Sequence, residues 1–336
     1  QVLDRKIECL CGMGFVVFIE AARRDVSQVW KTYGGWPDSY ARYVQYLYAR
    51  CHADNTLLSP IHFDWDQYSI PSRDYNVPAN QVVDRYGPPP FGNLVGTNSG
   101  PSTLTHFGDD AEARWRTFHQ IGNWREHEHY WYLTEIWRTS PAHPAINGEP
   151  YYPGFPNDCP RADSPEAEAN NRSGLYGSLL SGALGGVIYG VEGIWGADIE
   201  PEARYHMHES IRFRSGDQVR HLRTFAEAAG GRLHDLVPDH EHLTPSRSGR
   251  PDGYIGWAYF AMVPDASVAL AYFERHCPDA HVRGLPHDAV YRARWFDPRD
   301  GVWGDAFTLA TDPMGRARIA IPRPDLDWGL CLERQG

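Results

Sequence analysis

Large apolar side chains recur at helical spacing in two stretches near the beginning of the chain, residues 2–12 and 37–53. A repeat every three or four positions is typical of a helix that packs on one face. Each stretch is followed by a short apolar run, at 15–19 and at 56–61, and such runs predict strands. The alternation of helix and strand favours a parallel sheet with helical crossovers.

The same alternation continues to about residue 230. Four more short apolar runs predict strands, at 93–97, 117–121, 145–147 and 186–189. Residues 201–229 predict one long helix, which begins at a Pro-Glu pair and ends at two glycines. The first 237 residues therefore predict an α/β domain.

The pattern changes after residue 237. Residues 238–253 are polar and contain proline and glycine, and we predict a linker there. Residues 254–336 contain short β-rich runs separated by turn sequences such as Asp312-Pro313-Met314-Gly315, which predict a small all-β sandwich. The six runs are 254–263, 269–275, 289–296, 307–311, 317–321 and 329–333.

Composition narrows the function classes. The chain has 336 residues, enough for one large and one small domain, and 32 Lys and Arg against 43 Asp and Glu give a net charge of -11. That charge repels phosphate backbones and anionic membranes, so we expect no nucleic acid and no membrane as partners. The 12 Trp and 19 Tyr offer faces on which neutral sugars stack, although such residues also fill cores.

Cysteine usage and the first residues say little about location. The six cysteines are scattered, and we expect them to be mostly buried or free thiols. No stretch approaches the ~20 apolar residues that a membrane-spanning helix needs. The chain begins with Gln1 inside a helical pattern, which indicates a start in mid-domain and leaves export and a cytoplasmic location both open. No oligomeric state is predicted.

Two segments carry a family resemblance. The run His143-Pro-Ala-Ile-Asn-Gly-Glu-Pro-Tyr-Tyr152 and the glycine-rich run from Tyr176 to Gly190, followed by Gly193-Ile194-Trp195, resemble the apiosidase-like glycoside hydrolases of family 140 and their relatives. The resemblance implies a TIM-type (β/α)8 barrel, a carbohydrate substrate, no cofactor, and a C-terminal β-domain often labelled as collagen-binding. The run 293–301 resembles that β-domain.

The resemblance also implies a truncated barrel. The segments that would supply the first two barrel strands do not precede Leu3, so the six predicted strands would be strands three to eight of the family's barrel. We therefore expect an incomplete barrel over 1–237 with an open sheet edge, followed by the linker 238–253 and the sandwich 254–336.

Glycosidic bond cleavage requires two acids that converge on the sugar, one to protonate the leaving oxygen and one to attack or stabilise the anomeric carbon. In barrels such residues lie at the C-terminal ends of strands. Asp64 follows the second predicted strand and Glu149 follows the fifth, and the resemblance implies that they are the acid/base and the nucleophile. Asp66 is the main rival of Asp64. The structural alternative for Asp64 is a loop carboxylate or helix cap, and for Glu149 it is an acid in a Gly-Glu-Pro turn. A separation of about 5 to 5.5 Å would predict retention, and roughly 6.5 to 9.5 Å inversion.

Other polar and aromatic residues close to or following the predicted strands are candidates for substrate binding, although each one taken alone is as often a packing residue. They are Glu20, Trp30, His62, Trp65, Asp66, Asn98, His119, Asn147, Tyr151, Tyr189, Glu192 and Trp195.

Three histidine pairs invite a metal interpretation: His127/His129, His206/His208 and His240/His242. None has the i, i+4 spacing of a helical zinc pair, so we expect no metal. Two alternatives to the hydrolase stay open, a metal-dependent hydrolase and a non-catalytic carbohydrate-binding or scaffold protein that keeps this fold. Ile61-His62-Phe63 motivates the second alternative, because it replaces the family's usual glycine-rich approach to the acid.

Overall fold

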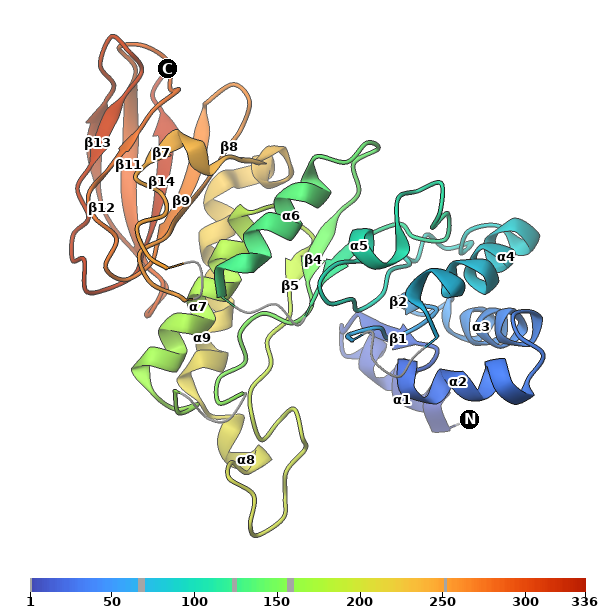
Figure 1. Cartoon of the computed structure of the whole chain (residues 1–336). Helices are drawn as coiled ribbons and strands as arrows, with labels where there is room; N and C mark the ends of the chain where they lie inside the picture. The colour runs from blue at the N-terminus through green and yellow to red at the C-terminus, as the bar shows by residue number, and fades with distance from the viewer. Residues whose placement is uncertain (1, 66–69, 123–125, 156–159, 251–252) are drawn as a thin grey trace. The chain divides into compact units, whose positions relative to one another are not determined.

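The computed structural model describes the whole chain except residues 1, 66–69, 123–125, 156–159 and 251–252 (Figure 1). The chain divides into two compact units: Gln1–Asn123 with Ile136–Gly148, and Trp124–Glu135 with Glu149–Gly336. Residues 238–253 lie inside the second unit, so the two units do not divide at the predicted linker. Each unit is described separately.

The first unit begins with parallel strands whose connections are helical. Strand β1 (Val17–Glu20) pairs in parallel with β2 (Thr56–Ser59), and α2 (Arg24–Tyr33) and α3 (Asp38–Cys51) lie between them in the chain. This order confirms the predicted strand, helix and strand at the start of the chain. Helix α1 (Val2–Gly12) precedes β1 at the predicted position.

Parallel pairing continues beyond β2. The predicted strand 93–97 is reduced to a bridge, in which Leu58 N donates to Leu94 O at 3.0 Å and Gly96 N donates to Leu58 O at 3.0 Å. Thr117 N then donates to Val95 O at 2.8 Å, and β3 (His119–Ile121) pairs in parallel with β4 (Ala145–Asn147). Five chain segments thus follow one another across the unit, and their carboxyl ends share one edge.

Helices and one core complete the first unit. The remaining helices are η1 (Ser72–Tyr75), α4 (Asn76–Tyr86) and α5 (Thr103–Phe107). The core is rich in aromatic rings, with Tyr40 from α3, Phe63 after β2, and Tyr75 and Phe107 buried together. The periodic apolar face of α3 supplies much of this core, and the same periodicity predicted the helix from the sequence.

The second unit contains two antiparallel sheets. A six-stranded sheet has the order β12-β11-β14-β9-β8-β6, and a three-stranded sheet has the order β13-β10-β7. Their bounds are β6 (Val237–Pro238), β7 (Leu243–Thr244), β8 (Ala258–Met262), β9 (Val268–Phe273), β10 (Ala280–Val282), β11 (Val290–Asp297), β12 (Val302–Ala310), β13 (Ala317–Ile319) and β14 (Trp328–Arg334). Both sheets contribute to one apolar core, as a sandwich requires.

Helices cover the other face of the six-stranded sheet. Helix α7 (Pro165–Leu180) is capped by Ser164, whose side chain accepts from Ala167 N, and α9 (Arg214–Ala226) packs beside it. Tyr176 and Phe225 of these helices are buried against Tyr272 of β9. The unit also contains η2 (Glu126–Glu128), the first residues of α6 (His129–Trp137), β5 (Gly186–Val187), α8 (Met207–Ser210), η3 (Glu227–Asp235) and η4 (His240–His242).

The prediction of one long helix over 201–229 is wrong at its start. Residues 201–206 form turns, and a break follows the short α8 before α9 begins at Arg214. Tertiary contacts explain the difference: Ala162 N donates to the Tyr205 hydroxyl at 3.1 Å, and the Tyr205 ring packs on Phe213. The prediction also missed β6, β7 and β10, which have only two or three residues each.

The sheet topology therefore shows a mixed α/β fold with a C-terminal antiparallel region, and a (β/α)8 barrel that lacks its first two strands stays a prediction from the resemblance. Among the described residues, no helix is long and apolar enough to cross a membrane.

Candidate active site

A row of polar side chains crosses the carboxyl ends of the parallel segments in the first unit. Glu20 ends β1, and its Oε2 lies 2.6 Å from Nδ1 of His62, which follows β2. Nε2 of His62 lies 3.4 Å from Nδ2 of Asn98. When Nδ1 of His62 donates to Glu20, Nε2 is an acceptor for the Asn98 amide, so one neutral tautomer satisfies both contacts.

The row continues to the last strand of the unit. Nε2 of Gln120, on β3, donates to Oδ1 of Asn98 at 2.8 Å. Gly148 follows β4 beside Gln120, and a Cβ atom at Gly148 would lie 1.9 Å from Gln120 Nε2. A side chain at position 148 would displace the Gln120 amide from its present place. The row Glu20, His62, Asn98, Gln120 and Gly148 spans all five segments.

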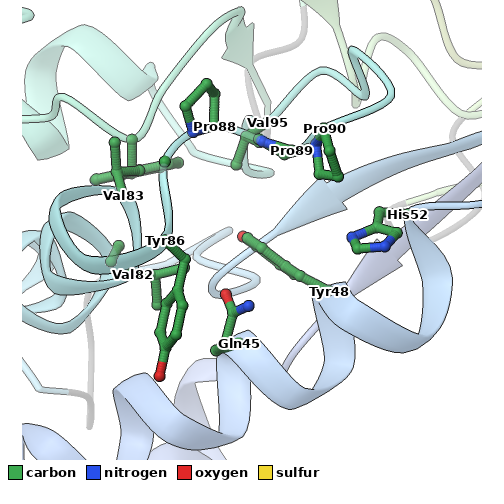
Figure 2. Close-up of a pocket in the computed structure, with 13 residues that line it drawn as sticks. Gln45, Tyr48, His52, Val82, Val83, Tyr86, Pro88, Pro89, Pro90 and Val95 are labelled. Carbon is green, nitrogen blue, oxygen red and sulfur yellow. The ribbon is translucent and has the colours of Figure 1, made fainter.

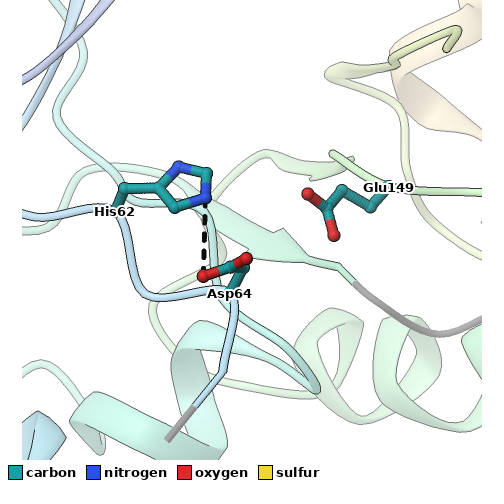
Figure 3. A group of neighbouring side chains, drawn as sticks. All are labelled: His62, Asp64 and Glu149. Carbon is teal, nitrogen blue, oxygen red and sulfur yellow. Dashed lines mark ion pairs between the residues drawn. The ribbon is translucent and has the colours of Figure 1, made fainter. Parts of the chain in front are cut away.

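Asp64 lies next to this row, beside His62 (Figure 3), and two arginines contact it. Its carboxylate pairs with Arg24, and its Oδ2 lies 3.5 Å from Arg23. His62 Nε2 lies 3.6 Å from Oδ1, the contact marked by the dashed line in Figure 3. The Asp64 side chain is only 14 % exposed, so water screens its attraction to the two guanidinium groups only weakly.

Glu149, the third residue drawn in Figure 3, is one peptide bond beyond the row. Gly148 N donates to Ile121 O at 2.8 Å, which fixes the backbone before Glu149 at the end of β3. The Glu149 side chain is half-buried. Glu149 itself is counted with the second unit.

The structure places the other candidates of the first unit in different environments. Trp65 is 52 % exposed beside Asp64, and Asp66 lies outside the described residues. Trp30 lies on α2 and stacks on Tyr43. Asn147 ends β4 and is buried directly before Gly148.

His119 does not join the polar row. Its side chain is 1 % exposed and its Nδ1 lies 2.9 Å from Thr103 Oγ1. Burial lowers its pKa to about 3, so the imidazole is neutral. The strand alternates, so the next residue, Gln120, reaches the row. The sequence prediction chose His119 and missed Gln120 and Gly148.

The second unit holds four more candidates. Tyr151 packs edge-on against Tyr254, and the Tyr189 hydroxyl lies 2.9 Å from Ser215 Oγ. Burial raises the pKa of Tyr189 to about 12. Glu192 is half-buried, and Trp195 is 61 % exposed with Phe155 against its ring. Of these, Trp195 offers the most open aromatic face.

The paired histidines have protein partners. His127 Nε2 lies 2.8 Å from the buried Glu274, and the buried His240 stacks on Tyr130. Nδ1 of His206 lies 3.3 Å from Glu209. These contacts give the histidines structural roles.

An apolar pocket of about 250 Å³ lies between α3 and α4 (Figure 2). Tyr48 and Gln45 from α3 face Val82 and Tyr86 from α4, and Pro88, Pro89 and Pro90 line the rest. The proline loop leads into the beginning of the segment around Val95, so this pocket lies at the end of the strands opposite the polar row. None of its 13 lining residues is an acid, and we do not place the chemistry there.

The chain is similar to known glycoside hydrolases in sequence and in fold. The model of the apiosidase-like catalytic domain matches residues 2–230. A solved glycoside hydrolase superposes with a TM-score of 0.76 at 15% identity, over 98% of this chain and 76% of that chain. A glycoside hydrolase family 5 structure from Bacteroides vulgatus ATCC 8482 gives a TM-score of 0.78 at 15% identity, over 98% and 73%.

No curated protein sequence gives a significant match. At 15% identity the solved structures establish the fold alone. The family match, in contrast, spans more than half of the chain, including the parallel strands and both residues of the candidate acid pair. The chain belongs to the apiosidase-like family and is a glycoside hydrolase.

Proposed function

We propose that the chain cleaves a glycosidic bond with Asp64 and Glu149 as its two carboxyl groups, and that it removes a terminal or branch sugar from a polysaccharide. The single observation that carries the proposal is the polar row from Glu20 to Gly148. The row lines the carboxyl ends of five parallel segments, where barrel enzymes keep their catalytic groups.

The positions of the two acids relative to this row support their pairing. Asp64 contacts the row through His62, and Glu149 follows its last member, Gly148. The proposed roles place a sugar ring between the two acids, above the carboxyl ends of the strands that carry the row. We propose that this ring occupies the face formed by Asn98 and Gln120.

The resemblance assigns the acid/base role to Asp64 and the nucleophile role to Glu149. In the first step Asp64 gives its proton to the leaving oxygen while Glu149 attacks the anomeric carbon, and the glycosidic bond breaks. In the second step Asp64 takes a proton from water, which attacks the same carbon and releases Glu149. The net reaction consumes one water and retains the anomeric configuration.

The positive groups around Asp64 bear on the first step. When Asp64 has given its proton to the leaving oxygen, its carboxylate pairs with Arg24 and lies near Arg23, and these two guanidinium groups stabilise the charge formed there.

The two acids are tested with Glu149→Gln and Asp64→Asn in a panel of aryl glycosides. Loss of a nucleophile or of an acid/base group is expected to lower kcat by at least about 10²–10⁴-fold. Azide should restore turnover to Glu149→Ala by forming a glycosyl azide. Asp64→Asn should keep its first step on a dinitrophenyl glycoside, because that leaving group needs no proton. Glu166→Gln, on the exposed side of α7, is the matched control.

Two further measurements test whether cleavage is terminal and whether the anomeric configuration is retained. Terminal cleavage releases a monosaccharide without shortening the main chain, so the viscosity of the polymer solution should not fall. Proton NMR of the first product should show the anomer of the substrate. Full activity of Glu149→Gln would remove it from the mechanism, and no activity of the unaltered chain on any glycoside would favour a carbohydrate-binding protein without turnover.

A further inference from the structure

Basic side chains gather on the outer face of the three-stranded sheet in the second unit. His281 of β10 lies opposite Arg318 of β13, and the buried pair Val282 and Ala317 follows in the same register. Because side chains alternate along a strand, His281 and Arg318 point away from the sandwich core. Both are exposed.

The next position along the same register is basic as well. Arg283 follows β10 directly and Arg316 precedes β13 directly, and both are exposed. Two strands thus present two neighbouring pairs of basic side chains on one face. We call His281, Arg283, Arg316 and Arg318 the basic face.

The basic face lines an open groove with a volume of about 730 Å³. Thr244 of β7 and Asp312 lie along the same groove. The lining side chains therefore include three arginines and a histidine but a single aspartate. No lining residue is Phe, Tyr or Trp, so the groove lacks the flat rings on which neutral sugars stack.

Stability does not account for this arrangement. Like charges directly opposite one another on a sheet are destabilising. Asp279 pairs with Arg318 at 2.7 Å and Asp312 pairs with Arg316 at 2.9 Å, which offsets part of the repulsion. Among the described ion pairs none includes Arg283, whose Nε donates to the carbonyl oxygen of Glu241 at 2.9 Å. The groove keeps a positive surplus in a chain whose net charge is -11.

We propose that this groove binds an acidic polysaccharide chain through the carboxylates of its uronic acid residues. A glycoside hydrolase meets carbohydrate chains, and guanidinium groups bind carboxylates through paired hydrogen bonds. A linear polyuronate carries one carboxylate on each sugar residue along its chain. The basic face likewise presents successive pairs of basic side chains along two strands, so several carboxylates can be bound at once. Binding here holds the polymer on the enzyme and raises the effective concentration of the bonds to be cleaved.

The proposal is tested by titrating the full chain with alginate, a linear polyuronate, and following binding by calorimetry at low salt. The double variant Arg283→Gln/Arg318→Gln should bind alginate at least about tenfold more weakly, because two charge-assisted contacts are lost. Turnover of a small aryl glycoside should stay unchanged in the variant. Arg292→Gln, an exposed and ion-paired arginine on β11 of the other sheet, should bind like the unaltered chain.

Two further ligands decide between ligand classes. Dextran, which is neutral, should not bind, and polyglutamate of similar charge density should bind more weakly than alginate. Equal affinity for polyglutamate would overturn the saccharide assignment, and unchanged alginate binding in the double variant would overturn the site. Absence of alginate binding at low salt would also overturn the proposal, while leaving the assignment of the catalytic acids untouched.

Discussion

The side-chain amide of Gln120 donates a 2.8 Å hydrogen bond to Oδ1 of Asn98, and this contact links two adjacent parallel segments at their carboxyl ends. It fixes the orientation of Asn98, whose own amide nitrogen lies near His62. The polar row is thus a connected set, in which a change at one end is transmitted to the neighbour of Asp64.

Gly148→Ala is expected to disturb this set without disturbing the fold. The new Cβ would lie 1.9 Å from Gln120 Nε2, and the Gln120 amide, being the end of a flexible side chain, has to swing away from Asn98. We expect kcat/KM to fall by about 10²-fold, the usual cost of misplaced active-site groups. The melting temperature should change by only a few degrees. Gly304→Ala is the control, because its nearest neighbour would be Trp295 O at 3.6 Å; equal activities of the two variants would contradict the role of the row.

Arg24→Gln tests the acid/base role of Asp64. Without the guanidinium group the carboxylate that Asp64 forms in the first step loses a charged partner, so kcat/KM should fall by roughly tenfold on glycosides whose leaving group needs a proton and much less on a dinitrophenyl glycoside. Equal losses on the two substrates would contradict our assignment of roles. Arg42→Gln, exposed on α3, should keep the activity of the unaltered chain.

The sequence predicted the elements that carry the site because burial imposes a pattern on them. Helix α3 has a periodic apolar face, and β1, β2 and β4 are short apolar runs after or between helices. Chain order alone then put Asp64 and Glu149 at strand ends. The match of the apiosidase-like family model over residues 2–230 confirms the family resemblance of the two short motifs.

The sequence does not show which side chains of a strand face the site. All three residues of β3 are buried, so alternation of polar and apolar residues does not separate its two faces. His119 was therefore as good a candidate as Gln120. The pairing of Arg24 with Asp64 joins residues 40 positions apart, and a single sequence does not show such contacts.

Three buried histidines should make stability depend on pH. Burial lowers the pKa of His119 and His129 to about 3 and that of His240 well below its ordinary value. Below about pH 6.5 these histidines bind protons in the unfolded chain but stay neutral in the folded chain. Their contribution to the free energy of unfolding is therefore full above that pH and decreases as the pH falls.

The expected slope is about 1.4 kcal/mol per pH unit for each histidine below pH 6. Urea unfolding at several values between pH 7.5 and pH 4.5 measures it. In His119→Gln the slope should decrease by the contribution of one histidine, about 1.4 kcal/mol per pH unit. His287→Gln, at an exposed position, should leave the slope unchanged. A free energy of unfolding that is flat over this interval would show that the buried imidazoles accept protons in the folded state.

Arg172 and Asp327 form a buried ion pair in the second unit, which joins α7 to the residue before β14. Nε and Nη2 of Arg172 each donate to the Asp327 carboxylate at 2.8 Å, and the Tyr272 hydroxyl adds a third hydrogen bond at 2.9 Å. Burial opposes the ionisation of Asp327, but Arg172 outweighs it and lowers the pKa of Asp327 below its ordinary value.

Arg172→Met leaves that carboxylate buried without its main partner, so the free energy of unfolding should fall by about 3 to 5 kcal/mol. Removing both charges in Arg172→Met/Asp327→Leu should restore at least half of the loss, because no unpaired charge remains. Arg223→Met breaks the exposed pair with Glu227 and should cost less than about 1 kcal/mol. Urea unfolding of the four proteins at pH 7.5 measures these differences, and a double variant no more stable than Arg172→Met would show that packing, rather than charge, makes Arg172 important.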